Sequence, residues 1–397
     1  MHSSKVTKKG IRLNDLYNPE GLADKLQSDL ETYNAIVAYK GLTDAKILEK
    51  CEEANIGMKR IPDHVVDFLK AADKTDYMIK LYMSGVVDNK DFPPMGDVSS
   101  ILRETLRSGG KILLEGPQGY WLSNGVETHW RSSTSALVHA SGILAAANVP
   151  LNYRTLVLNI HKVPSSRVGI GSNPAGYVPQ DYFSSRKIQT LTQLDGVCVD
   201  FDRIQREYFK SVRENGTLEP RIFEDNGSTF VISEAMAIAS ARKHGEKGAT
   251  TRKPRITGMF DCVAHNVVNQ VQGPYLSISA VDRYDSYDKV GVVIAYVYHD
   301  LEGRERVSNG KKYNNGDIIR PGEEYPNEEV LEYCYPIIKL IDGWKDHPIA
   351  AEKRGAGEEL PKGVKDLLGT IEHFTGARII SIGNGPNPKD LIYIERG

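Results

Sequence analysis

The chain has 397 residues, enough for one large domain or two ordinary domains with a full hydrophobic core. Hydrophobic residues make up 40% of it, charged residues make up 26%, and the net charge is −2, which excludes a chain-wide field suited to wrapping nucleic acid or coating a membrane. The four cysteines form no CxxC pair and no Cys/His cluster with zinc spacing, so a cytoplasmic, reducing compartment is expected. The N-terminal MHSSKVTKKG has no apolar core of a signal peptide.

The first part of the chain, residues 1–110, is expected to be a helical region. Asn18 can cap a helix with Pro19 at its first position, and apolar residues then recur at helical spacing. Further helices are expected from Asp44 and over His64–Met83.

The period of the apolar residues changes in residues 111–397. Short apolar runs predict buried strands, which alternate with helical patterns. The predicted strands are Lys111–Glu115, Thr155–His161, Tyr275–Val281, Val290–Tyr298, Arg378–Ile382 and Leu391–Ile394. The alternation predicts an α/β domain with a mostly parallel central sheet and flanking helices.

Two loops that follow predicted strands carry amides and hydroxyls. Gln118 lies in Glu115-Gly-Pro-Gln-Gly119, where its amide could read the edge of a purine ring, although a plain turn is an equally good interpretation. Ser132 opens a hydroxyl cluster ahead of an apolar helix, a pattern typical of helix capping and also of phosphate binding.

The most cationic stretch runs from Arg242 to Arg255 and holds a single acid, Glu246. Such a run is usually a solvated face, but this one encloses Gly248-Ala-Thr-Thr251, a hydroxyl-bearing loop suited to a carboxylate or phosphate. Asp282 ends a predicted strand, where it could bind a guanine edge or simply cap a turn. The sequence contains no GxxxxGK[ST] phosphate loop.

The order of these loops resembles the adenylosuccinate synthetase family. The loop at Glu115–Gly119 is similar to the family's EGAQG, Ser166–Ser172 to its TRVGxGP, Gly248–Asp261 to its GATTGRxRRxGWxD, Ser279–Asp285 to its TKLDVLD, and Ile380–Pro386 to its ISxGP. The resemblance covers essentially the whole chain, with insertions near residues 177–232 and 299–330. It implies the family's P-loop-NTPase-related fold.

The resemblance also implies a role for individual residues. A purine nucleotide, IMP in the family, is expected to contact Lys8, Gln118, Ser132 and Lys253. The aspartate site is expected at Ala249, Thr250, Thr251 and Arg255. The NTP base is expected to contact Asp282, Ser381, Gly383 and Gly385. Arg252 stands where the family has glycine, and Ala280 stands where it has lysine.

The implied activity is a ligase that joins L-aspartate to IMP with hydrolysis of GTP or ATP and with Mg²⁺ in the complete family enzyme. The resemblance starts at Lys5–Leu16, well inside a complete member, and the family's GDEGKGK loop, catalytic residues and metal ligands are absent from this sequence. The chain alone is therefore expected to be inactive, without catalytic or metal-binding residues, and to act as a homodimer or with a complementing N-terminal chain. Two alternatives remain open: a 2-aminoadenylosuccinate synthetase acting on dGMP with ATP, and a non-catalytic purine nucleotide-binding protein.

Overall fold

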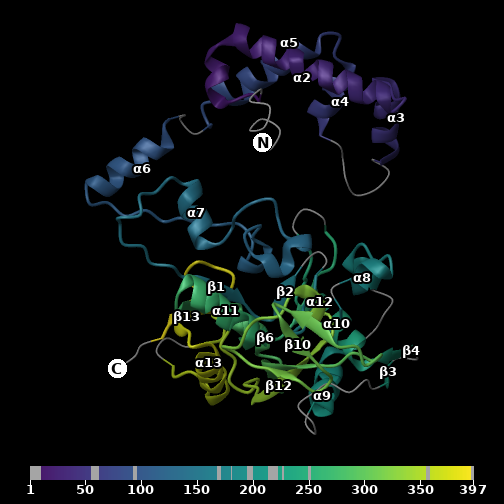
Figure 1. Cartoon of the computed structure of the whole chain (residues 1–397), viewed down its shortest axis with the longest axis vertical. Coiled ribbons are helices and arrows are strands. Elements are labelled where there is room, and N and C mark those ends of the chain that lie inside the picture. The colour runs from purple at the N-terminus through teal and green to yellow at the C-terminus, as the bar shows by residue number, and fades with distance from the viewer. Residues whose placement is uncertain are drawn as a thin grey trace. The chain divides into compact units, whose positions relative to one another are not determined.

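The computed structural model describes residues 10–54, 62–92, 96–167, 171–179, 181–194, 200–212, 222–225, 228–248, 252–354 and 358–394. The chain forms two compact units, Met1–Ile101 and Leu102–Gly397 (Figure 1). None of the described helices is long and apolar enough to cross a membrane.

The first unit is helical. It contains the 3₁₀ helix η1 (Leu13–Tyr17), the helices α2 (Pro19–Tyr39), α3 (Asp44–Ala54), α4 (Asp63–Lys70) and α5 (Lys74–Tyr82), and the π-helix η2 (Met83–Val87). Asn18 caps α2 through its side chain, which accepts a hydrogen bond from the Gly21 amide at 3.2 Å. The helix expected over His64–Met83 is broken, because the Asp73 side chain caps a new helix at Lys74.

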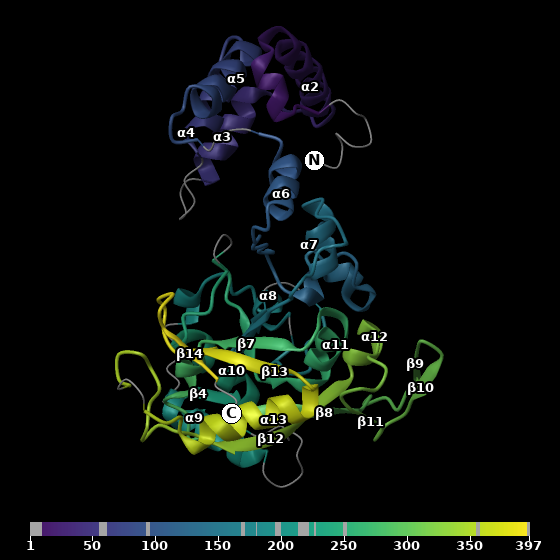
Figure 2. The same cartoon turned by 90° about the vertical axis from the view of Figure 1, so that its left-hand side faces the viewer.

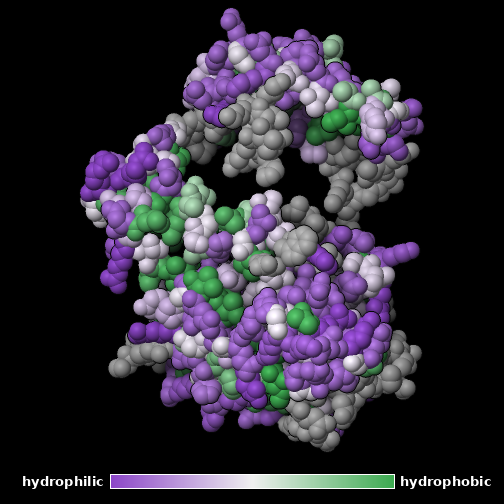
Figure 3. Space-filling view, viewed as in Figure 1, coloured by the Kyte–Doolittle hydropathy of each residue, from purple (hydrophilic) through white to green (hydrophobic). Residues whose placement is uncertain are grey.

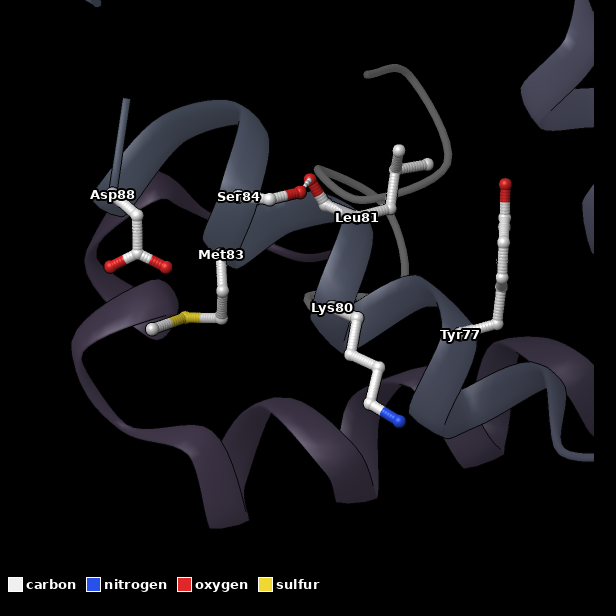
Figure 4. Close-up of a pocket in the computed structure, with 6 residues that line it drawn as sticks. All are labelled: Tyr77, Lys80, Leu81, Met83, Ser84 and Asp88. Atoms are coloured by element: carbon white, nitrogen blue, oxygen red, sulfur yellow. Dashed lines mark hydrogen bonds between the residues drawn. The ribbon is translucent and has the colours of Figure 1, made fainter. Parts of the chain in front are cut away.

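A shallow pocket lies along α5 and η2 (Figure 4). Figure 4 shows Lys80 and Met83 on one side of these helices, with Tyr77 and Leu81 pointing to the other side. Ser84 and Asp88 complete the lining, which includes none of the site residues expected from the sequence.

The second unit contains both helices and strands, and it holds the two clusters described below. Its helices are α6 (Val98–Arg107, shared with the first unit), η3 (Tyr120–Leu122), η4 (Glu127–Ser132), α7 (Ala140–Ala146), α8 (Tyr182–Ser185), η5 (Leu191–Leu194), α9 (Phe201–Ser211), α10 (Ile232–Lys243), α11 (Cys262–Gln272), η6 (Val281–Tyr284), α12 (Glu328–Leu331) and α13 (Lys362–Thr375). Its strands are β1 (Asn159–Lys162), β2 (Ser165–Arg167), β3 (Ile222–Asp225), β4 (Ser228–Val231), β5 (Ile256–Gly258), β6 (Phe260–Asp261), β7 (Tyr275–Ser279), β8 (Lys289–Tyr298), β9 (Arg306–Ser308), β10 (Lys311–Tyr313), β11 (Ile318–Ile319), β12 (Cys334–Asp342), β13 (Arg378–Gly383) and β14 (Leu391–Tyr393).

Two four-stranded sheets organise this unit. The first has the order β1-β7-β13-β14, in which β1, β7 and β13 are parallel and β14 is antiparallel. Figure 2 shows β7 and β13 side by side. The second sheet joins β11, β8 and β12 antiparallel, with β6 parallel to β8. Helix α13 contacts strands of both sheets. The α/β class is therefore confirmed, with mixed rather than purely parallel sheets.

Two of the expected strands are wrong in whole or in part. Lys111–Glu115 forms no strand, and Thr155–His161 is a strand only from Asn159 onward. Leu113 is 93% exposed and Leu156 is 70% exposed, and no strand of the described residues pairs with residues 111–115 or 155–158. Both runs have the composition of buried strands, but a strand also needs a neighbour to take up its backbone hydrogen bonds.

Candidate functional site

Three parallel strands bring their carboxyl ends to one edge of the first sheet. Lys162, the last residue of β1, pairs with Ser279, the last residue of β7. Ile278 of β7 pairs with Ile382 of β13. Ligands bind beyond the carboxyl ends of the strands in sheets of this kind. The loops that follow β1, β7 and β13 are therefore the first place to look for a site.

The loop after β7 holds an acceptor without a partner. Asp282 lies in η6, and Ala280 before it adopts a left-handed backbone with φ 60°. Within the described part of the chain, the buried Oδ1 of Asp282 accepts no hydrogen bond. Burial raises the pKa of Asp282 above its usual range. A ligand that donates N–H groups to this carboxylate would satisfy it, as the edge of a guanine ring does.

The loop after β13 packs closely against the loop after β7. A Cβ added to Gly383 would lie 3.3 Å from the Cα of Ser279, so the two backbones touch. Gly385 follows in the same loop. Ser381 lies one step back, inside the sheet, where its hydroxyl is 2.8 Å from that of Ser277 and its side chain is 5% exposed.

One buried carboxylate gathers three cations at the same edge. Glu246 follows α10, and its side chain accepts hydrogen bonds from Lys162 Nζ at 2.8 and 2.9 Å. Arg283, beside Asp282, bonds to Glu246 Oε1, and Arg255 Nη1 lies 3.6 Å from its Oε2. Burial opposes the charge of Glu246, but the bonds from Lys162 and Arg283 outweigh it and lower its pKa to about 2. The cluster carries a surplus of positive charge.

The two ends of the cationic loop, residues 246–255, pair with each other at this cluster. The Arg255 amide donates to the Glu246 carbonyl at 3.0 Å, and the Gly248 amide donates to the Lys253 carbonyl at 2.9 Å. Arg252 has φ 58°, which lies in the left-handed region of the backbone that favours glycine. The family's GATTGRxRRxGWxD motif has glycine at this position. The side chain of Lys253 is exposed. Ala249, Thr250 and Thr251, expected to bind aspartate, lie outside the described residues.

A second cluster surrounds Ser132. Arg167, at the end of β2, donates from Nη2 to Ser132 Oγ at 2.9 Å and interacts electrostatically with Glu328. A Cβ on Gly171 would collide with the side chains of both Arg167 and Ser132, at 2.7 Å from each. Burial, with Arg167 nearby, lowers the pKa of His129 to about 3, so this imidazole is neutral. A largely buried arginine beside a hydroxyl and glycine is suited to a phosphate group.

Two of the expected site residues are not joined to these clusters. Gln118 is exposed with φ 61°, and no hydrogen bond among the described residues links it to another expected site residue. Lys8 lies outside the described residues. Both assignments therefore stay predictions, as do the roles of the other residues carried over from the resemblance.

Sequence reasoning assigned no role to four charged residues of the two clusters. These are Lys162, Glu246 and Arg283 in the first cluster and Arg167 in the second. Arg167 was available as part of the TRVGxGP-like loop, and Glu246 as the one acid in a cationic run. Lys162 and Arg283 gave no signal of their own, because their importance comes from contacts between segments far apart in the sequence.

The described residues contain no group of three or more His, Cys, Asp or Glu side chains that could hold a metal ion. The unpartnered Asp282 oxygen suits a nucleotide base, whereas these residues offer no set of ligands to Mg²⁺.

Comparison with known proteins gives consistent results. The family model for adenylosuccinate synthetase matches residues 74–392. The chain is 52% identical to adenylosuccinate synthetase of Trypanosoma brucei gambiense, over 100% of this chain and 68% of that protein. It is 52% identical to adenylosuccinate synthetase 2 of Trypanosoma cruzi over 66% of that protein, and 49% identical to the Leishmania major enzyme over 58% of it. The chain thus spans between about half and two thirds of these relatives.

A solved structure agrees in fold. The fully ligated adenylosuccinate synthetase from Plasmodium falciparum aligns with a TM-score of 0.61 and 18% identity, over 99% of this chain and 68% of that one. At this identity the likeness concerns the fold alone. The dGMP-dependent enzyme and the non-catalytic binder are not favoured by any of these matches.

Proposed function

This chain belongs to the adenylosuccinate synthetase family, which acts in purine nucleotide biosynthesis, and we propose that it carries the purine-nucleotide and L-aspartate sites of a ligase that joins aspartate to IMP. The observation that carries the proposal is the edge of the first sheet, where three cations around Glu246 lie near Asp282, whose Oδ1 has no hydrogen-bond partner among the described residues. One anionic co-substrate and one nucleotide base can bind there side by side.

Each cluster is assigned a ligand by its chemistry. Arg255, with the loop at residues 249–251, would hold the carboxylates of aspartate. Asp282 would accept N–H bonds from the base of GTP, with the backbone at Gly383 and Gly385 alongside. Ser132 and Arg167 would hold the phosphate of the purine nucleotide, whose ring Gln118 would contact.

The chemistry of the family explains this division. The 6-oxygen of a purine is a poor leaving group, and GTP with Mg²⁺ supplies the phosphoryl group that activates it. The residues of this chain align the two nucleotides and hold aspartate so that its amine faces carbon 6. The surplus positive charge around Glu246 would favour the amino acid's two carboxylates as they enter.

Phosphoryl transfer needs a phosphate loop that this sequence does not encode. We therefore propose that turnover requires this loop from a complementing segment. The test is adenylosuccinate formation from IMP, aspartate and GTP by the chain alone and by the chain co-expressed with the part of the T. brucei gambiense enzyme that lies outside the match. Activity only in the second sample is expected. Turnover by the chain alone would refute the requirement, and turnover by neither sample would count against the ligase assignment.

The open edge of β1 is where such a segment would add. Leu156, Leu158 and Ile160 recur at every second position and are 70%, 43% and 73% exposed. Figure 3 shows hydrophobic surface gathered over β1 and α7. Among the described residues β1 pairs with β7 alone, and a strand with an unpaired edge favours addition of another strand. We assign this edge to the complementing segment, because about a third of the T. brucei relative lies outside the match.

A homodimer with a shared purine-phosphate pocket is a further part of the proposal. In the family, the position matching Lys8 reaches into a neighbour's site. Separately, the buried, unpaired thiols of Cys262 and Cys334 fit a reducing compartment such as the cytoplasm. Light scattering of the chain at micromolar concentration tests the dimer. A monomer whose nucleotide binding is unchanged by Lys8→Ala would remove both the dimer and the role of Lys8.

A further inference from the structure

Glu246 stands at the centre of a cluster whose members come from three separate segments. Lys162 ends β1, Arg255 ends the cationic loop, and Arg283 lies in η6. The Glu246 side chain is 5% exposed, whereas those of the three cations are 31%, 31% and 28% exposed. The carboxylate is therefore enclosed, while each cation keeps part of its surface open to a ligand.

The charges of the cluster do not balance. One carboxylate faces three cations, which leaves a surplus of two positive charges. Lys162 also donates to the Ser166 hydroxyl at 2.6 Å, a contact that fixes its direction but not its charge. Burial lowers the pKa of Lys162, and Glu246 opposes this shift. Without Glu246, three like charges would repel one another in partly buried positions.

The backbone of Glu246 is fixed as well. Its amide donates to the Ala241 carbonyl at 2.8 Å at the end of α10, and its carbonyl accepts from the Arg255 amide. Lys247 and Pro254 form an isolated β-bridge next to it. Glu246 therefore lies where the two ends of the cationic loop pair, and its side chain connects this position to β1 and η6.

We propose that Glu246 is a positioning residue, which holds Lys162, Arg255 and Arg283 at fixed places as a preorganised site for a dicarboxylate. The inference rests on the proposed function and deepens it, since the dicarboxylate of that reaction is aspartate. Arg283 supplies a cation on the same loop in which Ala280 stands at the position of the family's lysine. Positioning and simple charge neutralisation predict opposite effects when the charge of Glu246 is removed.

Binding to the whole chain separates the two possibilities. Glu246→Gln keeps an acceptor for Lys162 but removes the negative charge, so neutralisation alone predicts tighter binding of anions. Positioning predicts weaker succinate and aspartate binding by about tenfold or more, as calorimetry measures it, because the cations no longer hold their places. Glu246→Asp, which keeps the charge, should lie between Glu246→Gln and the wild type.

A matched control comes from another enclosed carboxylate. Asp300 is 1% exposed and pairs with Arg304 and Arg306 in a different part of the second unit. Asp300→Asn should lower the melting temperature without changing anion affinity. If Glu246→Gln does not fold, Glu246→Asp carries the test, and unchanged affinity in that variant would overturn the proposal.

Succinate and inorganic phosphate together distinguish this inference from the proposed function. Wild-type binding of phosphate but not succinate would refute both the dicarboxylate site and the aspartate assignment, even if Glu246→Gln weakened the binding of phosphate. Equal or tighter anion binding by Glu246→Gln would refute the positioning role and leave the proposed function intact. A wild-type chain that binds neither anion would overturn the inference.

Discussion

Strands β1 and β7 are neighbours in one sheet, yet their side chains meet different surroundings. Leu276 and Ile278 of β7 are fully buried, whereas Ile160 of β1 is 73% exposed even though it pairs with β7. The inner strand is covered on both faces and the edge strand on one, where His161 packs against Phe260. β1 holds one apolar residue, Ile160, whereas β7 holds three, so the contrast shows that this unit builds its core around β7 and β13 and keeps β1 at the edge of the sheet.

The largest effect is expected in the covered strand. Ile278→Ala should lower the free energy of unfolding by about 2–5 kcal/mol, because it removes buried methyl groups and leaves a cavity. Urea denaturation followed by circular dichroism measures it. A loss below about 1 kcal/mol would mean that β7 is not at the centre of a packed core.

A titratable group within the covered region sharpens the comparison further. Burial raises the pKa of Asp261 to about 6, against the hydrogen bond of 2.5 Å from Tyr296. Because the folded pKa lies above the unfolded value of 3.8, the contribution of Asp261 is fully present below about pH 4 and is lost as the pH rises through 6. The loss amounts to roughly 3 kcal/mol. Asp261→Asn should reduce the dependence of the melting temperature on pH between pH 4 and pH 7. An unchanged pH dependence in this variant would contradict the raised pKa of Asp261.

The carboxyl edge shared by β1 and β7 gives the next effect. Arg255→Ala should weaken aspartate or succinate binding by roughly 1.5–3 kcal/mol, since a charge-assisted partner is lost. Calorimetry with the whole chain measures it. Equal binding by the wild type and the variant would return the cationic loop to an ordinary solvated surface.

The smallest effect is expected at the open strand. Ile160→Ala should change the stability of the chain alone by no more than about 0.5 kcal/mol. The same substitution should weaken association with the complementing segment, because that segment would bury the isoleucine. A large loss of stability in the chain alone would show that the face is already covered.

The sequence was sufficient for much of the fold. The α/β class, the cap at Asn18 and the long strand near Val290–Tyr298 follow from local patterns, which depend on neighbours in the sequence. Lys111–Glu115 shows the limit, because its apolar composition cannot say whether a pairing strand exists. The site shows the same limit. Asp282 could be found from a motif, but the grouping of Lys162, Glu246 and Arg283 arises only when distant segments pack together.

The backbone of Arg252 has a consequence for the stability of the fold. A left-handed conformation is natural for glycine and costs an arginine about 1–2 kcal/mol, so the fold holds Arg252 in a conformation that its side chain disfavours. A glycine at this position would remove that cost but would lose more backbone entropy on folding. Strain in the folded chain and freedom in the unfolded chain therefore act in opposite directions at this one residue.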